Sequence, residues 1–237
     1  MRLDQAIAAR FPQYSRRKAR ELIASKHVLV NERLVAVSSR EVSDDDRIAV
    51  VESSPELDII RETPDWVAVN KPAGMPTQPT RDRASRSLEE LLRLQYREIY
   101  LVHRIDTPTS GVVIFARTRA AAASLSRLSA SGEIRKIYLA RVDPPIVNEL
   151  TIDAPIDGKE AITIVRPLRV MPPAVEVEIK TGRTHQIRIH LSGIGHPVVG
   201  DRRYGGLSAP RLMLHAWKLS HPQLGELVAP PPPFTSS

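Results

Sequence analysis

The sequence predicts an α+β protein with two parts, a compact unit over residues 1–51 and a larger domain over residues 62–237, joined by a linker at 52–61. Strand-like and helix-like segments are interspersed along the larger part without the regular βαβ rhythm of a parallel sheet. The length of 237 residues and the 42% share of apolar residues suffice for one good-sized core and a small additional one.

The first unit shows two helical patterns followed by short strands. The first helix starts near residue 3, and Ser15 is placed to cap the second. Residues 27–37 are typical of two strands around a turn at Asn31-Glu32, and residues 46–51 form a further strand. The inward faces of the two helices carry Leu3, Ile7 and Phe11, and Ala19, Leu22 and Ile23, at helical spacing.

The second helix is unusually basic in its first two turns. Residues 1–51 hold ten Lys/Arg against seven Asp/Glu, a net charge of +3 that is concentrated in this helix. An isolated basic run is most often an ordinary solvated helix face. The cations concerned are Arg16, Arg17, Lys18 and Arg20.

The larger domain has strands and helices with recognisable ends. The segment DWVAVNK alternates as a strand and is stopped by Pro72 and Gly74, and Gly132 ends a helix that begins after residue 118. Further strands are expected at 111–118, 134–142 and 174–182, strand material interrupted by turns at 151–158 and 162–170, and an amphipathic helix at 87–96.

The overall composition limits the function classes. A formal net charge of +7 and a pI of about 10.0 favour a polyanionic partner, either nucleic acid or a membrane surface. The absence of cysteine excludes disulfides and thiolate chemistry. The start of the chain lacks the apolar core of a signal peptide, and no apolar run is long enough to span a bilayer. We therefore expect a cytoplasmic protein without membrane attachment.

Several enzyme motifs can be tested and set aside. HRID resembles a protein-kinase catalytic loop, but the phosphate loop and the Asp-Phe-Gly motif are missing. Ser15 to Lys18 and Lys180 to Gly182 match two motifs of penicillin-recognising enzymes, but the middle motif is missing. No nucleotide fingerprint is present, and His185 and His190 do not have zinc-helix spacing. We expect neither a cofactor nor a metal.

The stretch LVHRIDTPTSG, residues 101–111, raises a different question. Its single carboxylate, Asp106, follows His103 and Arg104 and precedes a Thr-Ser-Gly turn. Asp106 either caps that turn or carries a reaction. Three other polar segments also lie where strands end or helices begin, which is where site residues collect: KPAG at 71–74, KIY at 136–138 and TGRTHQIRIHLSGIGHPVVGD at 181–201.

Taken together and in order, these segments closely resemble the RluA-type RNA pseudouridine synthases. The resemblance covers residues 62–222 and includes VNKPAG, HRIDTPTSG, KIYLARV, the long segment at 181–201 and LHAWKLSHP. Ile105 stands where the family pattern has leucine. The resemblance implies a pseudouridine synthase fold, with a mixed, largely antiparallel sheet, flanking helices and a central catalytic cleft.

The first unit likewise resembles the RNA-binding domain named after the fourth protein of the small ribosomal subunit. This resemblance implies that the four cations of the second helix contact RNA phosphates, which set affinity and register rather than sequence choice.

The family resemblance also implies roles for individual residues. Asp106 would be the catalytic carboxylate, Arg188 its basic partner, and Tyr138 the ring that stacks on uracil and accepts the C5 proton. Asp106 could attack ribose C1′, attack uracil C6 or abstract a sugar proton. Read locally, Thr184 can cap a helix that begins at His185 and ends at Gly193 or Gly195, which would point Arg188 into the cleft.

RNA contacts are implied at four further positions. Arg104 would enter the gap left by a flipped nucleotide, and Arg183 would contact phosphate or base. The other two positions are Lys71 and His185. The expected partner is RNA, with ribosomal RNA as the leading target, transfer RNA as the alternative, and no obligate protein partner evident. A non-catalytic RNA-binding or ribosome-assembly factor on the same fold is the alternative of a different class.

Overall fold

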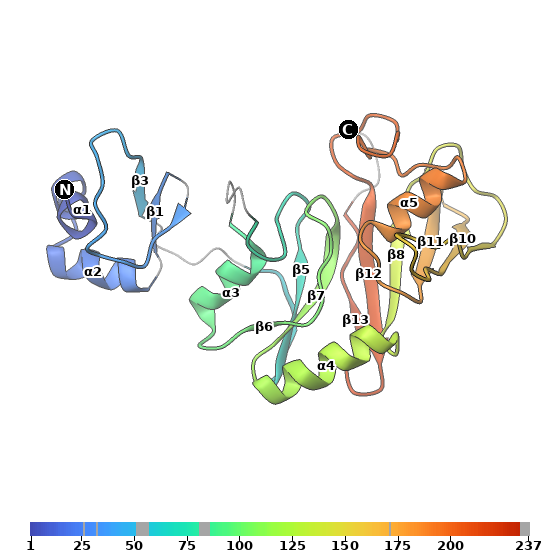
Figure 1. The fold of residues 1–237 in the computed structure, drawn as a ribbon, viewed down its shortest axis with the longest axis horizontal. Helices are drawn as coiled ribbons and strands as arrows, with labels where there is room; N and C mark the ends of the chain where they lie inside the picture. Colours follow the sequence, from blue (N-terminus) through green and yellow to red (C-terminus); the bar gives the residue numbers. More distant parts are fainter. Residues whose placement is uncertain (26, 32, 51–56, 81–85, 171, 233–237) are drawn as a thin grey trace. The chain divides into compact units, whose positions relative to one another are not determined.

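The computed structural model describes residues 1–25, 27–31, 33–50, 57–80, 86–170 and 172–232 (Figure 1). The chain forms two compact units, one containing residues 1–56 and 78–98, the other residues 57–77 and 99–237. The predicted domain boundaries at 51 and 62 remain predictions. Residues 59–61, however, belong to a strand of the large sheet rather than to the predicted linker, because Ile59–Glu62 pairs with the next strand along the chain.

The first unit contains the helices and strands predicted for it. Helices α1 (Leu3–Arg10) and α2 (Arg16–Ala24) precede a three-stranded antiparallel sheet in the order β2-β1-β3. The strands are β1 (Val28–Val30), β2 (Arg33–Leu34) and β3 (Ile48–Val50). Ser15 caps α2 by accepting a hydrogen bond from the backbone N–H of Lys18. The predicted inward faces of both helices are buried in one core, with Phe11 partly buried against it.

Helix α3 (Leu88–Gln95) also belongs to this unit and begins with a capping box. The Ser87 hydroxyl accepts a hydrogen bond from the Glu90 backbone N–H, and the Glu90 carboxylate accepts one from the Ser87 backbone N–H. The predicted amphipathic helix at 87–96 is therefore confirmed, and the local capping box of Ser87 and Glu90 sets where it begins.

The second unit is built on one ten-stranded mixed sheet. Its main path runs β4-β5-β7-β12-β8-β11-β10-β9, while β6 pairs with β7 and β13 with β12. Every neighbouring pair is antiparallel except β7 and β12, which are parallel, so the expected largely antiparallel sheet is confirmed. The strands are β4 (Ile59–Glu62), β5 (Trp66–Lys71), β6 (Tyr100–Leu101), β7 (Ser110–Ala116), β8 (Arg135–Ala140), β9 (Leu150–Ile152), β10 (Thr163–Leu168), β11 (Ala174–Ile179), β12 (Leu214–His221) and β13 (Gly225–Val228).

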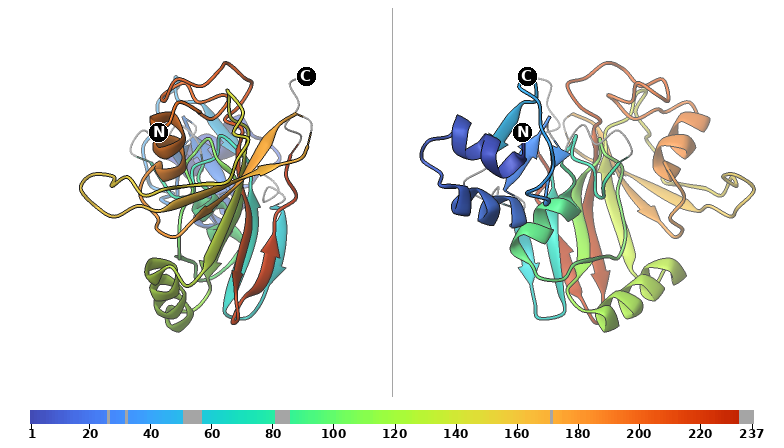
Figure 2. Two further views of the ribbon diagram at one scale, coloured as in Figure 1. Left: turned by 90° about the vertical axis from the view of Figure 1, so that its right-hand side faces the viewer. Right: turned by 60° about the vertical axis from the view of Figure 1, so that its left-hand side comes forward.

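Two helices flank this sheet. Helix α4 (Arg119–Ser131) ends, as predicted, at Gly132 in the left-handed conformation, and α5 (Gln186–Gly193) follows β11. Both helices lie on the same side of the sheet, near opposite ends of its strands (Figure 2). Among the described residues, no helix combines the length and the apolar character that a membrane crossing requires.

The parallel contact between β7 and β12 is the shortest seam on the main path of the sheet, with only two residue pairs in register. Gly111 lies there with a φ of +116°, and a Cβ on it would come within 2.2 Å of the Ala216 carbonyl oxygen. All seven residues of β7 are buried. Because the approach is backbone to backbone, no side-chain movement can relieve a clash.

We predict that Gly111→Ala lowers the free energy of unfolding by about 3 kcal/mol or more, because it adds overpacking and backbone strain at once. Thermal and urea unfolding measure the change. Gly193→Ala is the matched control, since a Cβ there meets nothing within 4 Å at a helical position. Equal stability of the two variants would show that the seam can open without cost.

Candidate active site

The backbone around Asp106 is held from three directions. Thr77 donates its hydroxyl to the Ile105 carbonyl at 2.8 Å and accepts the Ile105 N–H at 3.3 Å. The Thr107 carbonyl accepts the Gly74 N–H at 2.8 Å. The Asp106 carbonyl accepts the Thr109 N–H and so closes the turn with its backbone. Residues 102–106 belong to no strand, and the preceding strand β6 ends at Leu101, so the expectation that Asp106 stands at the end of a strand is wrong.

Lys71 also holds this backbone segment through hydrogen bonds. Its ammonium group donates to the carbonyls of Pro72, Met75 and Thr107 at 2.9, 2.6 and 3.2 Å, and its side chain is fully buried. Burial lowers the pKa of Lys71 to about 7, with the charge of Asp106 acting in the opposite direction. The prediction that Lys71 contacts RNA is wrong, because its side chain is buried and its ammonium group is hydrogen-bonded to three backbone carbonyls around the segment that carries Asp106.

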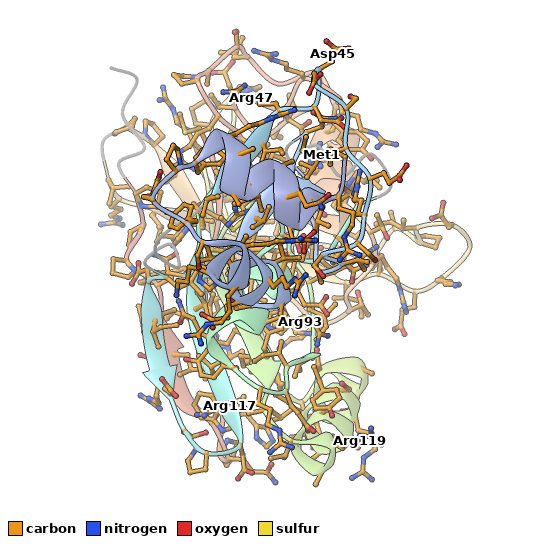
Figure 3. All side chains as sticks on the ribbon, turned by 90° about the vertical axis from the view of Figure 1, so that its left-hand side faces the viewer. Met1, Asp45, Arg47, Arg93, Arg117 and Arg119 are labelled. Atoms are coloured by element: carbon orange, nitrogen blue, oxygen red, sulfur yellow. The ribbon has the colours of Figure 1, made fainter. Side chains whose placement is uncertain are left out.

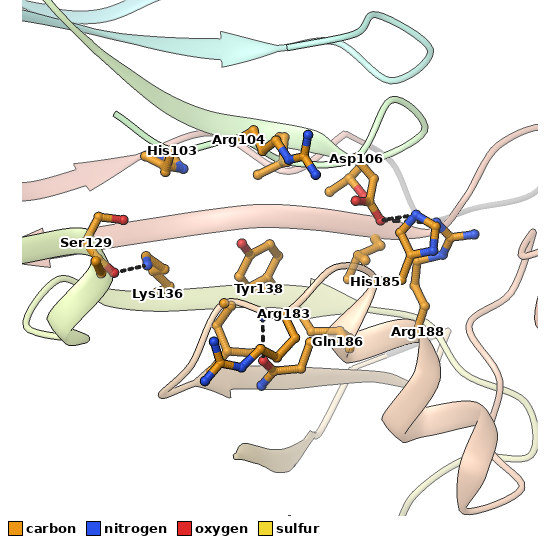
Figure 4. Close-up of a pocket in the computed structure, with 17 residues that line it drawn as sticks. His103, Arg104, Asp106, Ser129, Lys136, Tyr138, Arg183, His185, Gln186 and Arg188 are labelled. Atoms are coloured by element: carbon orange, nitrogen blue, oxygen red, sulfur yellow. Dashed lines mark hydrogen bonds and ion pairs between the residues drawn. The ribbon is translucent and has the colours of Figure 1, made fainter. Parts of the chain in front are cut away.

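The Asp106 carboxylate points away from this support into a cavity of about 370 Å³, a size typical of small-molecule sites (Figure 4). Its Oδ2 accepts a hydrogen bond from Arg188 Nη1 at 3.1 Å and lies 3.7 Å from His185 Nε2. About a quarter of the Asp106 side chain remains exposed. The Asp106 side chain therefore faces the cavity, and the turn is closed by the Asp106 backbone carbonyl.

Helix α5 aims Arg188 at Asp106, but its start differs from the prediction. The helix begins at Gln186, and its N-cap is His185 in the left-handed conformation, with no side-chain capping bond in this described segment. Thr184 is not the cap. Gln186 stabilises the approach instead, accepting from the Thr181 hydroxyl and the Arg183 N–H and donating to the Ile162 carbonyl. The helix ends at Gly193, one of the two predicted positions.

Arg188 is shared between two carboxylates. Its Nε and Nη2 donate to Asp201 at 2.6 and 2.9 Å, while Nη1 reaches Asp106. Asp201 is buried, and its Oδ1 also accepts the N–H groups of Arg203 and Tyr204. Burial alone would lower the pKa of Arg188, but the hydrogen bonds to Asp201 and Asp106 outweigh it and raise the pKa. The guanidinium is thus fixed in place and permanently charged.

Tyr204 contacts both Arg188 and His185. The Arg188 guanidinium lies 5.0 Å from the centre of the Tyr204 ring, within cation–π range. The Tyr204 hydroxyl forms a hydrogen bond with His185 Nδ1 at 2.9 Å. Burial lowers the pKa of His185, with Arg188 adding to the effect and Asp106 opposing it. The imidazole beside Asp106 is therefore neutral at pH 7.

Tyr138 forms the floor of the cavity, on the central strand β8. Its ring is buried, and it faces the row of Arg104 and Asp106 in Figure 4. Burial, followed by the negative charge of Asp106, raises the pKa of Tyr138 well above its usual value. Lys136, two residues earlier, donates to the Ser129 carbonyl at 3.0 Å. The phenol is accordingly uncharged across the physiological range.

His103 helps to hold the segment that carries Asp106. Its Nε2 accepts the Ile114 backbone N–H at 3.1 Å, which assigns the proton to Nδ1. Burial, together with the Lys136 ammonium, lowers the pKa of His103 to about 3. Arg104 is exposed and lines the cavity, as does Arg183, whose Nε donates to the Glu160 carbonyl at 2.8 Å.

The structure thus brings Asp106, Arg188, Tyr138, Arg104, Arg183 and His185 around one cavity. Sequence reasoning assigned no role to Asp201, Tyr204, Gln186 or Thr77. Asp201 is the last residue of the long motif at 181–201 and follows Gly200, and this position was the feature of the sequence that could have indicated a role for it. No feature of the sequence indicated a role for Thr77. No group of three or more His, Asp or Glu side chains suited to a metal ion occurs in the described part of the chain.

The predicted basic residues of α2 lie in the other unit. Arg16 and Arg20 form ion pairs with the buried Asp4. Arg17 and Lys18 lie within 3.7 Å of Glu21 instead. The predicted cluster is therefore divided between two acidic partners.

Comparison with protein-family models gives two matches. Residues 65–193 match the model for RNA pseudouridylate synthase, a range that includes Asp106, Tyr138 and Arg188. The chain belongs to the RNA pseudouridylate synthase family. Residues 1–48 match the S4 domain, as the sequence of the first unit predicted.

Relatives and solved structures agree with this assignment. The synthase is 35% identical over 239 residues to ribosomal large subunit pseudouridine synthase D of Xylella fastidiosa, covering 86% of this chain and 71% of the relative. It is 32% identical over 242 residues to the protein of the same name from Escherichia coli, covering 88% and 74%. Human RNA pseudouridylate synthase domain containing 1 superposes with a TM-score of 0.63 at 30% identity, covering 77% and 86%. The enzyme therefore isomerises uridine to pseudouridine in RNA.

We predict that Asp201→Asn lowers kcat about 100-fold, because a loosened Arg188 misplaces the charge beside Asp106. The test is a double-mutant cycle with Arg188→Met, measured in single-turnover assays. If Asp201 acts through Arg188, the Asn substitution has little further effect once Arg188 is gone.

Thermal melting of all four proteins separates this effect from a loss of folding, since removing one partner of a buried ion pair also destabilises. Effects that multiply across the cycle would contradict a shared role for Asp201 and Arg188.

Proposed function

We propose that this synthase converts specific uridines of ribosomal RNA to pseudouridine in the cytoplasm, with Asp106 as the catalytic carboxylate and without a cofactor. The observation that carries the catalytic part is the Asp106–Arg188 pair at 3.1 Å, opening into a cavity floored by Tyr138. The ribosomal target is supported by the relatives named ribosomal large subunit pseudouridine synthase D and by the S4 domain.

The reaction needs no redox partner or energy source. The bond from uracil N1 to ribose C1′ breaks, the base turns, and C5 bonds to C1′ while its proton is lost and N1 gains one. Asp106 can start this sequence by attacking C1′, by attacking uracil C6 or by removing a sugar proton. All three routes require an ionised, accessible carboxylate. The quarter-exposed side chain and its single bond to Arg188 leave the other oxygen, Oδ1, to meet the substrate.

Arg188 holds the Asp106 carboxylate in place through one hydrogen bond. Two of its nitrogen atoms are bound to Asp201, so only Nη1 is directed to Asp106. The pair of carboxylates and one guanidinium carries a net charge of −1, which favours the electron-poor sugar centre that forms when the glycosidic bond weakens.

Tyr138 is proposed as the platform for the uracil ring. A buried, neutral ring on a rigid strand provides a stacking surface, and such stacking is worth about 1–3 kcal/mol per base. Because its pKa is raised, the phenol stays protonated and offers no phenolate to accept the C5 proton. The structure therefore supports the stacking role more strongly than the predicted base role.

RNA contacts are proposed at the rim of the cavity. Arg104 is exposed beside Asp106, where it can fill the gap left by the flipped nucleotide. Arg183 and His185 line the same cavity from the other edge. Flipping costs a few kcal/mol of unstacking, which stacking on Tyr138 and phosphate contacts offset. The cations of α2 are proposed as phosphate contacts of the S4 domain.

We predict that Asp106→Asn lowers the rate of pseudouridine formation by about a thousandfold or more, since the amide cannot act as nucleophile or base. RNA affinity should persist, because Arg188 keeps its two bonds to Asp201. Isotopic release from C5-tritiated uridine in ribosomal RNA measures the reaction, and filter binding measures affinity. Undiminished product would overturn the role of Asp106, and no product from the wild-type protein would favour a non-catalytic factor. Product from transfer RNA alone would change the substrate.

Substitutions at Tyr138 separate stacking from proton transfer. We predict that Tyr138→Phe keeps the single-turnover rate within about tenfold of wild type, because the ring remains, whereas Tyr138→Ala loses about 1–3 kcal/mol of base stacking. Detection of a stalled intermediate in Tyr138→Phe, with C5–C1′ joined but the C5 proton retained, would restore the phenol as the base. Unchanged binding and rate in Tyr138→Ala would contradict the stacking role.

A further inference from the structure

Asp4 is a buried carboxylate in the first turn of α1 that lies outside the catalytic unit. Its side chain is fully buried, yet three arginines reach it. Arg20 Nε donates to Oδ2 at 2.8 Å, Arg16 Nε to Oδ2 at 3.2 Å, and Arg2 Nε to Oδ1 at 3.1 Å. We call Asp4 with Arg2, Arg16 and Arg20 the arginine fan.

The fan holds more positive charge than its own anion balances. Three guanidinium groups and one carboxylate leave a net charge of +2 in one small region. Burial alone would raise the pKa of Asp4, but the hydrogen bonds from Arg20, Arg2 and Arg16 outweigh it and hold the pKa well below its usual value. Asp4 is therefore ionised at any pH at which the domain functions, and the excess charge is permanent.

All three arginines donate to Asp4 through Nε, and Arg2 also donates through Nη2 at 3.5 Å. Each guanidinium is therefore held along the edge that carries Nε. About half of each side chain stays exposed, with 42% for Arg2, 47% for Arg16 and 52% for Arg20. A guanidinium held in this way is oriented before a ligand arrives, so less side-chain entropy is lost when it binds.

The fan draws cations from separate parts of the chain. Arg16 and Arg20 lie one turn apart on α2, and Arg2 precedes α1. Their common attachment point fixes how far the three charged ends can spread. Adjacent phosphates of a nucleic-acid backbone are the ligand that such an array fits, since arginine binds phosphate through two parallel N–H bonds.

Neighbouring cations on the same helix are arranged differently. Arg17 and Lys18 pair with Glu21 at 3.6 and 3.7 Å, and the Arg17 side chain is 91% exposed. Exposed pairs of this kind contribute little and leave both side chains free to move. The basic run SRRKAR therefore contains two kinds of cation, fixed and unfixed.

We propose that Asp4 is a positioning residue that holds Arg2, Arg16 and Arg20 as one receptor for consecutive phosphates of the RNA backbone. This inference rests on the proposed function for the identity of the polyanion as RNA. It goes beyond a general basic surface because it makes an acidic residue essential for binding an anion.

This consequence gives a test in which two explanations predict opposite changes in RNA affinity. Asp4→Asn raises the net charge of the protein by one, so a simple charge effect would tighten RNA binding. Loss of a positioning residue weakens it, by about tenfold, and lowers the salt slope of log K by about 1. Fluorescence anisotropy with a labelled RNA hairpin that has a uridine-containing loop measures both quantities over a range of KCl concentrations.

Asp45→Asn is the matched control for charge. Asp45 lies in the loop before β3, is exposed and projects outward in Figure 3. It makes no ion pair with other described residues, and its substitution also raises the net charge by one. We expect this variant to bind the hairpin at least as tightly as the wild-type protein.

A second pair of variants keeps every charge and the buried carboxylate. Arg16→Lys with Arg20→Lys removes the guanidinium geometry from the fan, and Arg40→Lys with Arg47→Lys makes the same change at two exposed positions outside both the fan and α2. We expect the first pair to weaken binding about tenfold and the second pair to leave it within about twofold.

The outcomes decide the proposal. Tighter or unchanged binding by folded Asp4→Asn overturns it, as does equal binding by the two lysine pairs. If circular dichroism shows that Asp4→Asn is unfolded, the lysine pairs decide alone. Pseudouridine formation by the wild-type protein is measured separately, so failure of the proposed function is distinguished from failure of the fan.

Discussion

The active site depends on the division of one guanidinium between two carboxylates. Arg188 gives two nitrogen atoms to the buried Asp201 and one to the partly exposed Asp106. A buried arginine with a single acidic partner would either draw that partner inward or lose its own position. With Asp201 as anchor, Arg188 orients Asp106 through one hydrogen bond and leaves its other oxygen open to the cavity.

The remaining structure fixes the two ends of this arrangement. Asp106 sits on a segment that Lys71, Gly74 and Thr77 hold through the backbone, without touching its carboxylate. Arg188 sits on a helix whose first residues are tied down by Gln186 and covered by Tyr204. Backbone bonds on one side and side-chain bonds on the other hold both partners in place and leave part of the Asp106 carboxylate accessible from the cavity. Preorganisation of this kind reduces the reorganisation that the reaction would otherwise require.

Local sequence rules predicted most helices and strands correctly. They failed at positions where contacts between residues far apart in the sequence determine the structure. Ser15, Ser87 and Gly132 set helix ends as predicted, because caps depend on neighbours within four residues. Thr184 was expected to cap α5 on the same logic, but the chain enters the helix through a left-handed His185 held by Tyr204, nineteen residues away. Lys71 looked like a surface cation in its motif, and only the fold reveals that it is buried.

The sequence by itself determined the class of the fold, the family, and six of the residues that line the cavity, because motif order and helical or strand periodicity are properties of the chain. The tertiary structure alone decided which charges meet. Asp106 and Arg188 are separated by 82 residues, and Asp201 and Asp4 become anchors only once distant arginines converge on them. Burial gives these pairs their strength, and burial is set by packing among segments that lie far apart in the sequence.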